Sequence, residues 1–236
     1  MDNYNVTIMS KFIDIINTRE DISDFVYHFA KHNYAKQTLT SILSENAVKD
    51  INGNGYISFT EAPLTILPAM FAHFEKFERP MYAPYGIAFK KDLFYQIGGR
   101  PVIYGDQQDK KQLPKELMWR FEFLYPGTYD FSWLREWRIP LSALQLNGND
   151  CFAIVKTRQD EEDMRDFFFE LGDIDFDTQP EDGGQFTEVT GYFSRKIKVI
   201  SMEEIIETTY MSKQQLASLL KEQSNQYGCS LGSTWE

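Results

Sequence analysis

Residues 50–61, DINGNGYISFTE, place oxygen-bearing side chains at the spacing of an EF-hand calcium loop. The positions that would supply ligands are held by Asp50, Asn52, Asn54, Ser58 and Glu61. Gly55 stands where such a loop turns sharply, and carboxylate and amide oxygens are the ligands that Ca²⁺ prefers. Against calcium, Pro63 and Pro68 disturb the helix that should follow, and no second loop pairs with this one. We therefore favour a polar turn leading into a strand YISFT, with calcium binding as the weaker alternative.

A second chemical feature is the carboxylate of Glu136 within the apolar stretch DFSWLREWRIP, residues 130–140. Arg135 and Arg138 flank it closely in the sequence. The ordinary explanation is an amphipathic strand whose charged face meets solvent. The alternative is that the carboxylate lies among apolar residues because it has a catalytic or binding role.

Two common catalytic motifs are absent from the sequence. There is no GK[ST] phosphate loop and no HExxH, and the histidines are only His28, His32 and His73. Cys151 and Cys229 lie 78 positions apart without a CxxC or Cys/His cluster, which argues against a structural zinc site. We expect no metal site apart from the calcium alternative.

The net charge of −11 is concentrated in one segment of the chain. Residues 160–182 contain eleven acids and one base, which leaves a charge of about −1 for all other residues. We interpret residues 158–185 as an acidic insertion or arm, which is either a solvated loop or a docking surface for a basic protein partner. No run of Lys and Arg offsets it, so we expect no direct nucleic-acid partner.

No stretch of the sequence has the length and apolar character of a membrane span or a secretory leader. We therefore expect a cytoplasmic protein that does not enter membranes.

Short apolar and β-branched runs dominate the middle of the chain. In FVYHFA, residues 25–30, alternation places Tyr27 and Phe29 on one face of a strand and Val26 and His28 on the other. A helix should follow, since Leu39, Ile42, Leu43 and Ala47 recur at helical spacing, and a helical region is expected near 63–78, interrupted by Pro68. Capping patterns at Ser201 and Ser212 predict C-terminal helices over 201–224. The sequence predicts one α+β domain, 1–236, with a short-stranded mixed sheet and flanking helices over a core at 20–157.

Four segments in this order resemble a family of bacterial proteins associated with abortive phage infection, the AbiGi-like group. They are FVYHFAKHNYAKQTLTSILSENAV, YISFTEAPL, YGIAFKKDLFYQIGGRPVIY and DFSWLREWRIP, within residues 25–140. The same order is similar, more distantly, to the ADP-ribosyltransferase fold of DarT-type toxins. This resemblance implies NAD⁺ as the cofactor and Glu136 as the carboxylate that stabilises the oxocarbenium-like sugar formed when the nicotinamide–ribose bond breaks.

The resemblance also assigns roles to residues of the first two strands. His28 matches the polar residue that would hold a ribose by hydrogen bonds, with Tyr27 beside it at the cofactor; a buried structural histidine is the alternative. Ser58 and Thr60 lie where hydroxyl groups could support Glu136, and capping of the next helix is the alternative role for Thr60.

Two aromatic residues and two arginines complete the implied site. Tyr85 or Phe89 would stack on the nicotinamide ring, although core packing is the commoner fate of such residues. Arg138, or else Arg100, would pair with a phosphate. The sequence departs from the pattern at Leu134, where relatives often carry a second acid, and this makes transfer to an arginine-type acceptor less favourable.

Three functions follow as expectations. The first is a phage-defence or toxin–antitoxin protein that cleaves NAD⁺, as an ADP-ribosyltransferase or NAD glycohydrolase. The second is a non-catalytic antitoxin or sensor that binds a basic partner through residues 160–182. The third is calcium binding through residues 50–61. The first requires His28 and Glu136 to line one cleft, whereas positions on opposite faces of the sheet would count against it.

Overall fold

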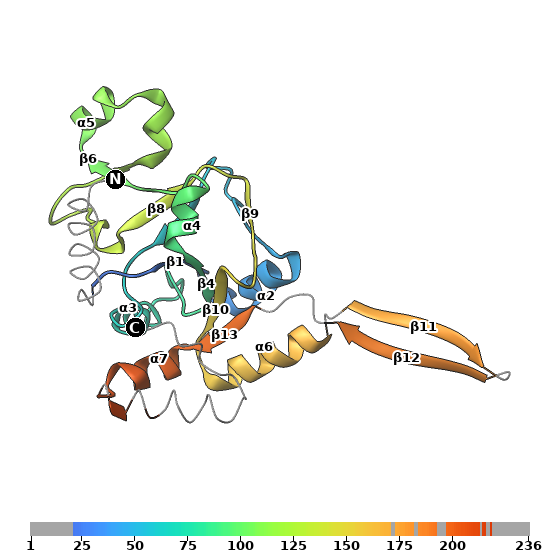
Figure 1. Ribbon diagram of the computed structural model, residues 1–236. Helices are drawn as coiled ribbons and strands as arrows, with labels where there is room; N and C mark the ends of the chain where they lie inside the picture. The colour runs from blue at the N-terminus through green and yellow to red at the C-terminus, as the bar shows by residue number, and fades with distance from the viewer. Residues whose placement is uncertain are drawn as a thin grey trace, which may run out of the picture.

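A computed structural model describes residues 21–170, 173–181, 184–192, 197–212, 214–215 and 218. Its centre is a mixed sheet of seven strands in the order β13–β10–β4–β1–β3–β8–β5, in which only β10 and β13 are parallel (Figure 1). In chain order these strands are β1 (Phe25–Phe29), β3 (Ile57–Thr60), β4 (Gly86–Lys90), β5 (Arg100–Pro101), β8 (Glu136–Ile139), β10 (Cys151–Val155) and β13 (Lys198–Ser201). The predicted α+β class with a short-stranded mixed sheet is confirmed.

Three two-stranded pairs and several helices surround this sheet. The pairs are β2 (Ala47–Lys49) with β9 (Ala143–Gln145), β6 (Ile103–Gly105) with β7 (Phe121–Phe123), and β11 (Asp173–Glu181) with β12 (Gly184–Tyr192). The α-helices are α2 (Ala35–Glu45), α3 (Leu67–Phe74), α4 (Lys91–Gln96), α5 (Gln107–Gln112), α6 (Arg158–Glu170) and α7 (Met202–Thr209). Two 3-10 helices are η1 (Lys115–Arg120) and η2 (Ser132–Leu134).

Alternate residues of β1 serve two separate hydrophobic cores, because successive side chains of a strand point to opposite faces. Val26 packs in a cluster with Leu39 of α2, and α4 and α6 contribute to the same cluster. Tyr27 and Phe29 pack in a second cluster with Phe71 of α3, to which α7 also contributes. The alternation predicted for residues 25–30 is therefore confirmed, and helices cover both faces of the sheet.

The predicted helices need two corrections. Ala47, read as part of the apolar stripe of α2, lies in β2, because Asn46 takes a left-handed conformation (φ 55°) and ends the helix there. Pro68 does not interrupt α3. It sits in the first turn of that helix, where a proline removes no intrahelical hydrogen bond.

The stretch 130–140 is not one strand. Residues Ser132–Leu134 form η2, Arg135 is left-handed with φ 45°, and β8 begins only at Glu136. Leu134 is buried and does not share a strand with Glu136, so the two positions are not neighbours on one strand face.

The start of the acidic segment is structural rather than a solvated arm. The backbone N–H of Thr157 donates to Asp160 Oδ2 (3.1 Å) and that of Asp160 donates to Thr157 Oγ1 (3.1 Å), so the pair caps α6. Asp160 also pairs with Lys36 (2.7 Å) and accepts from the Tyr85 hydroxyl (2.9 Å). Burial alone would raise the pKa of Asp160, but the hydrogen bonds from Lys36, Thr157 and Tyr85 together lower it.

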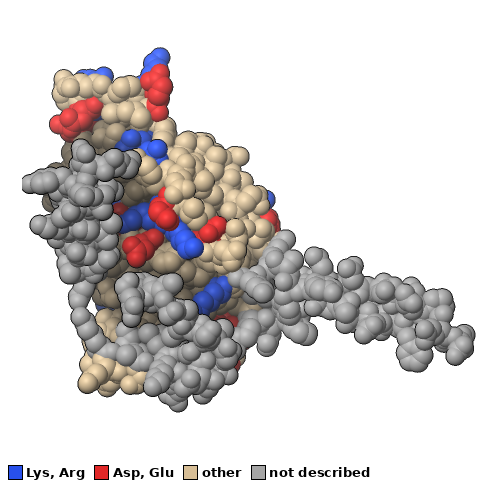
Figure 2. Space-filling view, viewed as in Figure 1, with Lys and Arg blue, Asp and Glu red and all other residues tan. Residues whose placement is uncertain are grey.

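Beyond α6 the chain forms the β11–β12 hairpin, which extends away from the sheet in Figure 1. Near the centre of the face shown in Figure 2, several described acidic and basic side chains lie next to one another.

Replacing Asp160 with Asn should lower the free energy of unfolding by about 1–3 kcal/mol, because Lys36 loses a buried ionic partner and the cap of α6 is weakened. Urea unfolding at neutral pH would measure the loss. Asp163→Asn is the control, since this carboxylate also contacts Lys36 at 2.7 Å but lies in solvent. Equal losses in the two variants would contradict the structural role of Asp160.

The predicted C-terminal helices over 201–224 are described only in part, so that prediction is not confirmed as a whole. Helix α7 is capped by Ser201, whose Oγ accepts from the N–H of Glu204 (3.3 Å). Ser212 and Gln215 form the predicted reciprocal cap, and residues 214, 215 and 218 are helical. The remainder of 201–224 lies outside the described residues. None of the helices among the described residues is long and apolar enough to span a membrane.

Candidate functional site

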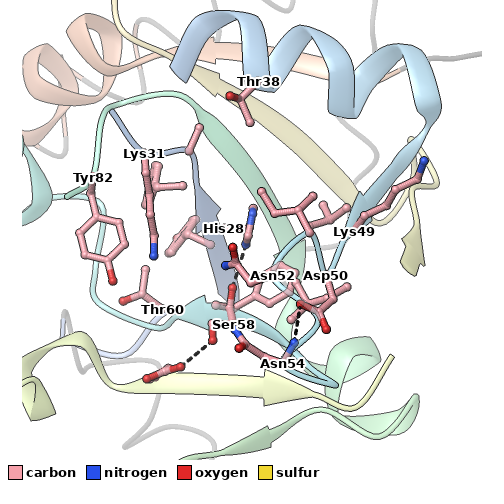
Figure 3. Close-up of a pocket in the computed structure, with 18 of the residues that line it drawn as sticks. His28, Lys31, Thr38, Lys49, Asp50, Asn52, Asn54, Ser58, Thr60 and Tyr82 are labelled. Carbon is pink, nitrogen blue, oxygen red and sulfur yellow. Dashed lines mark hydrogen bonds between the residues drawn. The ribbon is translucent and has the colours of Figure 1, made fainter. Parts of the chain in front are cut away.

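The central sheet opens between β1 and β3. Within the described chain, Tyr27 and Thr60 form the one ladder pair that joins these strands, whereas β1 pairs with β4 at five positions. A cavity of about 760 Å³ lies where the end of β1 and the start of β3 separate (Figure 3). Its walls come from β1, α2, β3 and β8 and from segments near residues 81–82 and 122–134. This volume falls within the range of small-molecule sites, roughly 300–1,000 Å³.

His28 stands at this opening with one ring nitrogen held by the neighbouring strand. Its Nδ1 lies 2.8 Å from the backbone oxygen of Ser58, which can only accept a hydrogen bond, so Nδ1 carries the proton. Burial lowers the pKa of His28 and thereby favours the neutral ring. In a neutral ring with a protonated Nδ1, Nε2 is an acceptor that can receive a hydrogen bond from a ligand hydroxyl.

The lowered pKa of His28 makes stability depend on pH. The unfolded chain takes up the proton near pH 6.5 while the folded protein does not, so the unfolded state binds more protons below that pH. We expect the free energy of unfolding to fall as the pH drops from 7.5 through 6.5, by no more than about 1.4 kcal/mol per pH unit from this residue.

Denaturation curves at pH 7.5, 6.5 and 5.5 would measure this dependence in the wild type and in His28→Asn. The variant should show a shallower fall. His32→Asn is the matched control, because His32 is exposed and its left-handed backbone (φ 65°) suits Asn. The same slope in wild type and His28→Asn would refute the assignment.

Glu136 lies at the cavity wall with its carboxylate held at a fixed position. Ser58 Oγ donates to Oε1 (2.7 Å), Arg138 Nε donates to the same oxygen (2.8 Å), and Arg138 Nη2 reaches Oε2 (3.3 Å). The side chain is 13% exposed. Oε2 is the less engaged oxygen and is the one with capacity for a ligand.

Arg138 is not available for a ligand phosphate, which corrects the role implied by the resemblance. The side chain is 4% exposed and its guanidinium stacks over the ring of Tyr56 at 4.3 Å. Nη1 donates to the backbone oxygens of Trp119 (3.1 Å) and Phe121 (2.8 Å), and Nη2 also donates to Glu122. With the bonds to Glu136, all five N–H groups have partners, so Arg138 organises the acids instead.

His28 and Glu136 line the same cavity, as the first expected function requires, but they come from opposite faces of the sheet, which counts against that function. His28 shares its face with Phe59, as their ring contact at 5.4 Å shows, whereas Glu136 is paired with Thr60 and bonded to Ser58 on the other face. Both residues are part of the cavity lining, together with other residues of β1 and β3. Ser58 joins the two residues, through its backbone oxygen to His28 and its hydroxyl to Glu136 (Figure 3).

Tyr27 and Thr60 line the cavity but are bonded within the protein. The Tyr27 hydroxyl lies 2.8 Å from Ser23 Oγ, and burial raises the pKa of Tyr27 to about 12. Thr60 Oγ1 donates to the backbone oxygen of Leu134 and accepts from the N–H of Ala62 (3.1 Å). Thr60 therefore neither supports Glu136, as Ser58 does, nor caps α3.

Tyr85, Phe89 and Arg100 are not at the cavity, contrary to expectation. Phe89 is 5% exposed in the core, because β4 lies between two strands and helices cover the sheet. The hydroxyl of Tyr85 is bonded to Asp160. Arg100 donates to the backbone oxygens of Tyr95 and Gly99, both at 2.7 Å, at the edge strand β5.

Sequence reasoning missed several residues of the cavity wall, among them Glu122, Tyr129, Lys31 and Tyr82. Glu122 accepts from Arg138 Nη2 and from the Tyr129 hydroxyl (3.1 Å). An acid between two aromatic residues, in FEF at 121–123, carries the same signal as Glu136 and could have been noticed. Lys31 belongs to a loop and lies 5.7 Å from the ring of Tyr82, and its sequence neighbours carry no signal.

The two carboxylates of the calcium-like loop, Asp50 and Glu61, are bonded within the protein, and Asn52 and Asn54 line the cavity. Asp50 accepts from the backbone N–H groups of Asn54 (3.1 Å) and Gly55 (2.7 Å), which makes a polar turn ahead of β3. Glu61 accepts from Lys91 (2.8 Å) and from the Trp137 ring N–H (2.7 Å). Across the described residues there is no group of three or more His, Cys, Asp or Glu side chains that could hold a metal ion.

Comparison with protein-family models, curated proteins and solved structures gives no match to this chain.

Proposed function

We propose that this protein cleaves NAD⁺ in the cavity between β1 and β3 and transfers ADP-ribose to an acceptor or to water. The observation that supports the proposal is the connected set His28–Ser58–Glu136, whose members all line the cavity although His28 and Glu136 lie on opposite faces of the sheet. It supplies a neutral hydrogen-bond acceptor and a fixed carboxylate across an opening of suitable volume.

Each residue lies in an environment that suits the role proposed for it. Nε2 of His28 would accept a hydrogen bond from a ribose hydroxyl and hold the sugar in one orientation. Glu136 Oε2 would face the positive charge that develops on the ribose as nicotinamide leaves with the bonding electrons. Ser58 and Arg138 hold the carboxylate before the substrate arrives, so little reorganisation is needed during the reaction.

The cavity also offers groups for the rest of a dinucleotide. Lys31 points into it beside Tyr82 (Figure 3), and the ion pairs between described residues leave it without a carboxylate partner. An ammonium group in this position suits a pyrophosphate, and the ring of Tyr82 suits a stacked base. All N–H groups of the Arg138 guanidinium already have partners within the protein. We therefore assign the binding of the pyrophosphate to Lys31 and not to Arg138.

The biological setting that we propose is bacterial phage defence or a toxin–antitoxin pair. It rests on the resemblance of residues 25–140 to the AbiGi-like group.

The test is to incubate the purified protein with NAD⁺ and to measure free nicotinamide, comparing the wild type with Glu136→Gln. Release by the wild type and its loss in the variant would support the function. Equal release from both would refute the role of Glu136. No release by the wild type, with NAD⁺ binding retained in calorimetry, would leave a non-catalytic sensor as the better description.

A further inference from the structure

Two carboxylates of the cavity share one arginine. Arg138 Nη2 donates to Glu136 Oε2 at 3.3 Å and also to Glu122 Oε2. Two oxygens bonded to one nitrogen are at most about 6.5 Å apart, the sum of two hydrogen-bond lengths. The two acids therefore face the same small volume, although β7 and β8 carry them in different sheets.

The position of Glu122 is set by its strand and by its second partner. On β7 the neighbour Phe121 is buried, and the alternation of the strand turns Glu122 toward Arg138 and the cavity. Its Oε1 accepts from the hydroxyl of Tyr129 at 3.1 Å, and the side chain is 22% exposed. A carboxylate oxygen has two acceptor positions, so Oε1 retains one that can face a water or hydroxyl group.

The shared arginine also explains how both acids remain together. Two adjacent carboxylates repel each other, and the buried guanidinium between them offsets that repulsion. The cluster of Glu122, Glu136 and Arg138 carries a net charge of −1, which is the complement of a cationic sugar. Enzymes that form such sugars commonly use one carboxylate to stabilise the cation and a second to activate the nucleophile.

We propose that Glu122 is the general base of this site. This inference rests on the proposed function. The second acid thus comes from a separate strand, 14 positions before Glu136 in the sequence. Water or an acceptor hydroxyl is the class of nucleophile that such a base serves.

The C1′–N bond of the nicotinamide riboside breaks, and neutral nicotinamide leaves with both bonding electrons. The oxygen of the nucleophile forms a bond to C1′ while its proton passes to Glu122 Oε1. The carboxylic acid then returns the proton to solvent, and no oxidant or metal is required.

The experiment measures kcat and KM for nicotinamide release over pH 5–9 in the wild type, Glu122→Gln, Glu122→Asp and Glu136→Gln. Glu122→Gln keeps an oxygen for Arg138 but cannot accept a proton, and we expect kcat to fall about 10²–10³-fold. KM should change by less than about threefold, and the fall in rate on the acidic side should disappear from the pH profile. Glu116→Gln, an exposed acid on η1, is the matched control and should behave as the wild type.

Glu122→Asp controls for misfolding. It keeps a negative charge near Arg138 but moves the carboxylate back by the length of one methylene group. Glu122→Asp should show much of the loss in kcat that Glu122→Gln shows, while its midpoint of thermal unfolding stays unchanged. Wild-type kcat in both Glu122 variants, with activity lost in Glu136→Gln, would overturn the inference and leave the proposed function standing. A loss of activity in Glu122→Gln that leaves the fall in rate at acidic pH unchanged would also overturn the inference. Absence of nicotinamide release from the wild type would overturn both.

Discussion

Replacing Arg138 with Met is expected to lower the free energy of unfolding by about 3–5 kcal/mol, the usual result of removing one partner from a buried ionic network. Methionine fills most of the space but donates no hydrogen bond. Glu136 and Glu122 would be left close together without a counter-charge, and the backbone oxygens of Trp119 and Phe121 would lose their donor. Guanidinium chloride unfolding, with the slope of the transition checked for constancy, would measure the loss.

Two further variants separate the network from a general effect of losing an arginine. Arg135→Met removes the same charge three positions away, where the side chain is 41% exposed and pairs with Asp21, so a far smaller loss is expected. Adding Glu122→Gln and Glu136→Gln to Arg138→Met should restore part of the stability, because the repulsion between the acids is then removed. Equal losses in Arg135→Met and Arg138→Met would show that the network contributes little.

The residues that sequence reasoning placed well are those whose role follows from local pattern. The alternation of Val26, Tyr27 and Phe29 predicts which face of β1 each side chain occupies, since a strand has a fixed period of two. The hydroxyl and amide of Ser212 and Gln215 predict a helix cap from their spacing alone. The α+β class follows from many such local features, none of which requires knowledge of distant contacts.

The residues that were misplaced depend on contacts between distant segments. Arg138 looks like a free cation in WREWR, but its partners come from η1 and β7, which lie 16 to 19 positions earlier. Tyr85 looks like a stacking residue, but its hydroxyl is bonded to Asp160, 75 positions away. No pattern within either stretch indicates these partners, and they arise only when the sheet is assembled.

Local sequence spacing also points to the wrong position for a second acid. Leu134 lies two residues before Glu136, as a paired acid would on one strand, yet the chain there is a 3-10 turn followed by a left-handed residue. Glu122 approaches from another sheet through the shared Arg138. The absence of an acid at 134 therefore does not leave the cavity with a single carboxylate.

Glu136→Gln is expected to lower kcat for nicotinamide release by about 10²–10³-fold, the usual effect of removing one preorganised electrostatic group from a reaction that develops charge. KM should change little, because the amide occupies the same volume and the stabilisation is needed only in the transition state. Nicotinamide release at saturating NAD⁺ would measure kcat directly.

Ser58→Ala should lower kcat by about tenfold, corresponding to one hydrogen bond to a charged group of roughly 1.5 kcal/mol. The hydroxyl donates to Glu136 Oε1 at 2.7 Å, and without it the carboxylate keeps Arg138 but gains freedom to turn. Ser41→Ala is the matched control, because Ser41 also lines the cavity while its hydroxyl is bonded to the backbone of α2 at Gln37. In the Glu136→Gln background Ser58→Ala should have a much smaller additional effect, since the two residues act through one hydrogen bond. A tenfold loss that persists undiminished in that background would show that Ser58 acts independently of Glu136.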